Sequence, residues 1–147
     1  MQSNYNYRDQ FFKSGSFKIN DLFSKSDLKN LEINLYDLAT QFAKKINNKI
    51  FKNQNINNFN KFNKFCINLE KYNKDYFFNF ATMASNTFEL KKISLNNRLR
   101  HIASQVLDEK PNNLLFQHPT LLINLPNNKR ILYHCLLYTS PSPRDGL

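Results

Sequence analysis

The chain has 147 residues, a formal net charge of +10, 14 phenylalanines, seven tyrosines and no tryptophan, which is enough for one domain with a hydrophobic core. Its two glycines exclude a glycine-rich phosphate-binding loop, and no apolar run approaches the roughly 18 residues of a membrane span. Residues 1–10 lack the apolar stretch of a signal peptide, so we expect a cytoplasmic protein with no membrane partner.

The first third of the chain is predicted to contain a short helix, a short strand and a long helix. Residues 7–13 have helical character, and Gly15 follows as a helix-ending glycine. Residues 16–20 alternate apolar and polar side chains, which predicts a strand. Ser24 is expected to cap a helix over residues 25–47, because its oxygen can accept an unpaired backbone N–H. The apolar residues of this helix recur at helical spacing: Leu28, Leu31, Leu35, Leu38, Phe42 and Ile46.

The middle of the chain is predicted to be an irregular connection followed by further helices. Residues 49–63 are rich in Asn, Lys and Phe and show no periodicity, which indicates a loop. Residues 65–72 and 74–90 have helical character. Ser94 is expected to cap a last helix, in which an apolar stripe runs from Leu95 to Leu107.

Apolar runs suited to strands come next. Residues 114–116 and 121–125 are predicted as strands, and residues 131–133 as the beginning of a third. Helices followed by strands indicate an α+β fold. We therefore expect the helices to pack on a small sheet that includes residues 17–20 and 121–125.

The C-terminal residues differ in composition from the rest of the chain. Before Cys135 the chain is dominated by Asn, Lys, Ile, Phe and Tyr, whereas Pro141, Pro143, Arg144 and Gly146 follow it within a few residues of one another. The string Cys-Leu-Leu-Tyr-Thr-Ser-Pro-Ser-Pro-Arg-Asp at residues 135–145 resembles the in-frame translation of a sequencing-library adapter. Because such scars are excluded from fold analysis, we interpret residues 1–134 as an incomplete domain and residues 135–147 as adapter-derived. Cys66 is then the one natural cysteine, which excludes an internal disulfide and a cysteine-based metal site.

No catalytic constellation can be assembled from the residue pattern alone. His101 lies within an amphipathic helix and His118 within a loop, and both are interpreted as structural. The few carboxylates show no pairing suited to acid–base work: Glu70, Asp75, Glu89 and Asp108.

Two segments nevertheless resemble the phytanoyl-CoA dioxygenase-like family. Residues 8–46, with the string Phe-Phe-Lys-Ser-Gly-Ser-Phe-Lys-Ile at residues 11–19, are similar to that family's N-terminal short helix, glycine, strand and long helix. Residues 95–107, followed by His-Pro-Thr-Leu-Leu-Ile-Asn-Leu-Pro at residues 118–126 and then Lys129 and Arg130, resemble the family's approach to its His-x-Asp or His-x-Glu iron motif.

The resemblance implies an iron(II)- and 2-oxoglutarate-dependent dioxygenase, a hydroxylase, built on a double-stranded β-helix of the jelly-roll or cupin type. In this family two histidines and one carboxylate bind one face of the iron. His134 is the residue of this chain that the resemblance offers as a metal ligand, although the favoured alternative places it two residues before the first ligand. The catalytic residues and the other ligands are expected beyond it. The parent protein would thus be an enzyme acting on a small molecule, and this fragment would be inactive and bind neither iron(II) nor 2-oxoglutarate.

The alternative is a small basic helical module that binds nucleic acid through lysines and exposed aromatic rings. The lysines are interleaved with asparagines along the chain, and AT-rich coding raises both residue types, so we do not expect a nucleic-acid partner. The two interpretations differ in where the aromatic rings lie. An oxygenase N-terminus would bury Phe42, Phe80 and Phe88, whereas a nucleic-acid platform would place several rings beside lysines.

The adapter interpretation predicts the outcome of resequencing. A genomic amplicon from the source DNA, read across codons 130–147, should depart from the present sequence at or near Cys135. Recovery of the same codons from unfragmented DNA would contradict the interpretation.

Overall fold

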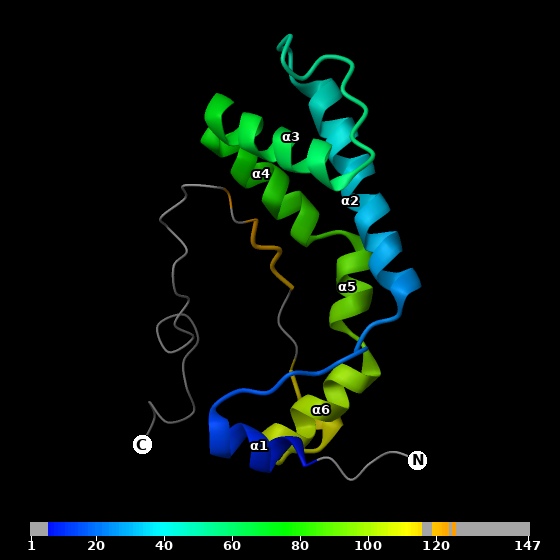
Figure 1. The fold of residues 1–147 in the computed structure, drawn as a ribbon, viewed down its shortest axis with the longest axis vertical. Coiled ribbons are helices and arrows are strands. Elements are labelled where there is room, and N and C mark those ends of the chain that lie inside the picture. The colour runs from blue at the N-terminus through cyan, green and yellow to red at the C-terminus, as the bar shows by residue number, and fades with distance from the viewer. Residues whose placement is uncertain (1–5, 116–118, 124, 126–147) are drawn as a thin grey trace.

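The computed structural model describes residues 6–115, 119–123 and 125, and these residues form helices and connecting segments without a β-strand. The elements are, in chain order, α1 (Tyr7–Ser14), α2 (Lys25–Lys45), α3 (Phe59–Tyr72), α4 (Lys74–Ser85), α5 (Phe88–Ser94), α6 (Asn97–Leu107) and the 3-10 helix η1 (Pro111–Asn113). Helices α3 and α4 pack against α2 at one end of an elongated arrangement, and α1 packs on α6 at the other (Figure 1).

Side-chain caps determine where most of these helices begin. The Ser24 hydroxyl accepts the Asp27 N–H at 3.0 Å and donates to the Asp27 carboxylate at 2.6 Å, which confirms the predicted cap of α2. Together with Lys92, this hydrogen bond lowers the pKa of Asp27. The other capping side chains are asparagines: Asn6 for α1, Asn58 for α3, Asn73 for α4 and Asn96 for α6. The abundant asparagines thus define helix boundaries.

The core is built from aromatic rings of three helices. Phe80 of α4 has no exposed surface, and its ring centroid lies 5.1 Å from that of Phe65, 5.5 Å from that of Phe42 and 6.1 Å from that of Phe62. These edge-to-face and tilted pairs are favourable beyond the area that they bury. Small or sulfur-bearing side chains let the helices approach around the rings: Ala39, Ala43 and Cys66, all fully buried.

A smaller set of contacts fixes α1, both to the segment that follows it and to the end of α6. Phe17 lies against the rings of Tyr7 and Phe11, with centroids 5.3 and 6.3 Å apart. Arg8 of α1 forms an ion pair with Asp108, which follows α6, at 2.6 Å. Gly15 ends α1 with a φ of +72°, the left-handed conformation that glycine adopts most readily, as the sequence predicted.

The predicted α+β fold, with helices on a sheet and the first strands of a double-stranded β-helix, is wrong for the described residues. Residues 16–20 form an irregular segment held by the half-buried ring of Phe17. Residues 121–123 and 125 also lie outside any strand. Leu121 donates its N–H to the Ser85 hydroxyl at 2.9 Å, and Ile123 and Leu125 pack against the core cluster. A strand requires a partner strand, and here helix side chains take that place.

The helix predictions differ from the structure mainly at their ends. The helix predicted over residues 25–47 is confirmed and ends at Lys45, whereas α3 begins six residues before the predicted residue 65. The helical region predicted over residues 74–90 is divided into α4 and α5, and Asn96, rather than Ser94, caps α6. Residues 116–118, 124 and 126–147 lie outside the described part, and with them His118, His134, the strand predicted at 131–133 and the adapter-like segment.

The central position of Phe80 predicts a large cost for its removal. Phe80→Ala should destabilise the protein by about 3–5 kcal/mol, because it leaves a cavity among three other rings. Phe78→Ala is the matched control from the same helix, since the Phe78 side chain is 69% exposed and its loss should cost about 0.5 kcal/mol or less. Urea unfolding followed by circular dichroism measures both, and equal costs would contradict the assignment of the core.

Candidate functional site

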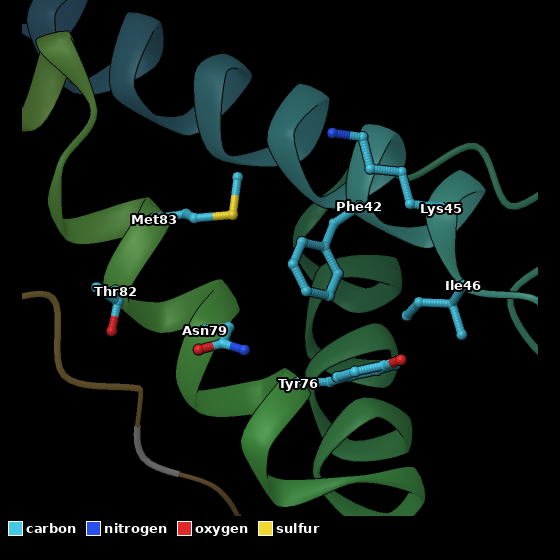
Figure 2. Close-up of a pocket in the computed structure, with 7 residues that line it drawn as sticks. All are labelled: Phe42, Lys45, Ile46, Tyr76, Asn79, Thr82 and Met83. Carbon is cyan, nitrogen blue, oxygen red and sulfur yellow. The ribbon is translucent and has the colours of Figure 1, made fainter.

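A largely apolar hollow in the described part of the chain lies between the C-terminal half of α2 and the exposed side of α4. It has a volume of about 490 Å³. Its lining residues are Phe42, Lys45, Ile46, Tyr76, Asn79, Thr82 and Met83. Figure 2 shows Met83 reaching toward Phe42 from the facing helix and the Tyr76 ring extending toward Ile46. We call this hollow the α2–α4 groove.

The position of Phe42 determines the shape of the groove. Its ring meets Tyr76 edge-on at 6.5 Å and Phe80 at 5.5 Å, so one face packs on the core while the other lines the groove. Lys45, Asn79 and Thr82 add polar atoms to an otherwise apolar lining. Among the described residues that line the groove there is no histidine, cysteine or carboxylate, and the lining offers mainly binding contacts.

The predicted site residues are not assembled into a metal centre in the described part of the chain. His134, the ligand that the resemblance offers, lies outside the described residues. The residues that the structure describes contain no group of three or more His, Cys, Asp and Glu side chains that could hold a metal ion. His101 lies exposed on α6, with its Nε2 atom 3.3 Å from the Gln105 amide nitrogen.

The burial of Phe42, Phe80 and Phe88 was expected to distinguish the oxygenase from the nucleic-acid interpretation, and the three rings differ in burial. Phe80 is buried in the core, as predicted, whereas Phe42 is only half-buried. The prediction is wrong for Phe88, which is 75% exposed because α5 begins at this residue as a separate helix. The sequence analysis also missed the groove. The i, i+3 spacing of Tyr76, Asn79 and Thr82 places them on one face of a helix, but this spacing cannot identify the helix that lies opposite.

Cys66 and Tyr36 are the described groups whose protonation is displaced most clearly. Burial raises the pKa of the Cys66 thiol to about 12, so this side chain packs as an apolar group. The Tyr36 hydroxyl donates to the Glu32 carboxylate at 2.5 Å, and burial together with this hydrogen bond raises its pKa to about 12. The pKa of Glu32 is lowered by hydrogen bonds from Lys29 and Tyr36.

Comparison of the chain with protein-family models, with curated proteins and with solved structures finds no match. Within the described ranges, no helix combines the length and the apolar character that crossing a bilayer requires.

The raised pKa of Cys66 predicts alkaline destabilisation. The unfolded thiol ionises near pH 8.5 whereas the folded thiol stays protonated to about pH 12, so stability should be complete below pH 8.5 and should fall as pH rises. Urea midpoints measured between about pH 8 and pH 10 test this, with Cys66→Ala as the control. The control should lose most of the pH dependence in that window, and an unchanged slope would contradict burial of the thiol.

Proposed function

We propose that the chain is the N-terminal helical part of an iron(II)- and 2-oxoglutarate-dependent oxygenase of the phytanoyl-CoA dioxygenase-like kind, and that it is inactive as given. One observation carries the proposal. Residues 8–46, which resemble that family's N-terminus, adopt a short helix, a left-handed glycine, an irregular segment and a long capped helix in that order. Three of these four elements are those that the resemblance implies, and the segment in the place of the strand has no partner strand among the described residues.

The described residues do not themselves fit an iron site. A facial triad needs two histidines and a carboxylate, and no such group occurs in the part of the chain that the structure describes. The proposal therefore gives the described helices a supporting role, with His134 as the nearest candidate ligand. No step of oxygen chemistry is assigned to the residues of α1 to α6.

The remaining parts of the proposal follow from the same assignment. The substrate of the parent enzyme would be a small molecule, and the α2–α4 groove supports this only as an apolar surface that can hold uncharged atoms. A cytoplasmic location is proposed as well, supported by the buried free thiol of Cys66.

The proposal predicts that the purified chain does not convert 2-oxoglutarate to succinate in the presence of iron(II) and ascorbate. A longer reading frame recovered from the same source DNA should carry out this conversion, because it would supply the missing ligands. Succinate formed by the present chain above a no-protein control would contradict the assigned inactivity. Absence of conversion by the longer protein, once shown to be folded and iron-loaded, would contradict the oxygenase assignment.

A further inference from the structure

One end of the described structure carries several lysines and no carboxylate. Between Asp37 and Glu70 the chain contains six lysines and no carboxylate. They are Lys44, Lys45, Lys49, Lys52, Lys61 and Lys64, and all are exposed. They belong to the last turn of α2, the connection 46–58 and the first half of α3, which Figure 1 places together at one end of the structure. We call this surface the basic end.

Two hollows lie side by side on the basic end. The larger, of about 600 Å³, is lined by Lys44, Lys45, Ile46, Asn47, Asn48, Lys49, Lys52 and Asn53. The smaller, of about 400 Å³, is lined by Asn53, Gln54, Asn55, Ile56, Lys61 and Lys64. Because Asn53 lines both, the hollows adjoin, and we call their combined surface the track; ammonium and amide groups stand on it among apolar surface, which predominates in the smaller hollow. Both groups hydrogen-bond to phosphate oxygens.

The connection that carries the track is fixed to the core at several points. Phe51 is fully buried, with its ring centroid 6.0 Å from that of Phe65 and 5.5 Å from that of Tyr72. Ile56 is buried as well, and its N–H donates to the Thr40 hydroxyl at 3.0 Å. Lys52 lies between these anchors and Lys49 lies two residues before the first, so both are held in place before any ligand binds, which lowers the ordering cost of binding.

Among the described residues, no carboxylate forms an ion pair with a lysine of the basic end. In the described residues, the ion pairs join Arg8 to Asp108, Lys29 to Glu32 and Lys92 to Asp27, and none includes a lysine of the basic end. The Lys61 ammonium donates to a neutral group, the Asn57 amide oxygen, at 3.0 Å. An accumulation of unpaired cations without a carboxylate favours a polyanionic partner.

An exposed aromatic ring narrows the class of partner. Phe59, the first residue of α3, is 64% exposed and lies two residues before Lys61. An exposed ring in the same helical turn as a lysine of the basic end can stack on an unpaired base, whereas the bases of a duplex are already stacked on one another. Two adjoining hollows also suit a linear chain of phosphates better than a single phosphate ion.

We propose that the basic end binds single-stranded nucleic acid, with the lysines of the two hollows on its phosphates and Phe59 against a base. This inference does not depend on the proposed oxygenase function. It also differs from the expectation drawn from the sequence, where the lysines were interpreted as scattered. The fold brings them together because the connection 46–58 turns back and is fixed to α2 and α3.

The test is fluorescence anisotropy of the full chain with a labelled single-stranded oligonucleotide of about 20 nucleotides, at salt concentrations between about 50 and 200 mM. The quadruple variant K44Q/K45Q/K49Q/K52Q should bind at least tenfold more weakly, and the slope of log affinity against log salt should become shallower by about 3. Phe59→Ala should weaken binding by about fivefold or more with the salt slope unchanged.

A charge-matched control separates the basic end from net charge alone. The variant K13Q/K18Q/K25Q/K110Q removes the same charge at exposed lysines elsewhere and should bind as the unaltered chain does. Equal losses in the two quadruple variants would overturn the proposal. The proposal would also be overturned if the chain bound heparin or phosphatidylserine vesicles as tightly as the oligonucleotide and if Phe59→Ala left the affinity for the oligonucleotide unchanged. Circular dichroism measures whether each variant keeps its helical content. If the quadruple variant of the basic end has lost it, K49Q/K52Q, which changes no helical residue, is measured in its place.

Discussion

The burial of Phe80 among Phe42, Phe62 and Phe65 is the interaction on which the rest of the structure depends. It joins α2, α3 and α4 into one unit and leaves no exposed surface on the central ring. The α2–α4 groove exists because Phe42 uses one face for this core. The basic end depends on the same cluster, since Phe65 also contacts Phe51, which fixes the lysine-bearing connection. One aromatic core thus positions both surfaces.

The features that the sequence predicted correctly are those decided by neighbouring residues. The Ser24 cap, the helix behind it and the left-handed Gly15 each depend on contacts within a few positions along the chain. The division of α4 from α5 was missed because Asn86 and Thr87 interrupt the helix while the apolar pattern continues through them. Phe88 was consequently assigned to the buried face of a helix to which it does not belong.

The features that could not be predicted depend on residues far apart in the sequence. The apolar run at residues 121–125 is compatible with a strand, but the pairing of a strand is decided by what lies beside it. Here the neighbour is α4, and a serine hydroxyl takes the place of a ladder hydrogen bond. In the same way, the spacing of the six lysines cannot reveal that they share a surface, because the buried contacts of Phe51 and Ile56 create that surface.

The hydrogen bond between Leu121 and Ser85 helps to explain why the segment at residue 121 is not part of a strand. The N–H of Leu121 has one hydrogen, so its bond to the Ser85 hydroxyl and a straight bond to a neighbouring strand compete for the same donor. Ser85 itself donates to the Ala81 carbonyl at 2.9 Å, so α4 keeps a partner for this hydroxyl when the segment leaves. If this segment left α4, the number of hydrogen bonds would change little. The larger loss would be the apolar packing of Ile123 and Leu125 against the core. The apolar packing of Ile123 and Leu125 on the helices, rather than strand propensity, thus decides the structure of the described residues of this run.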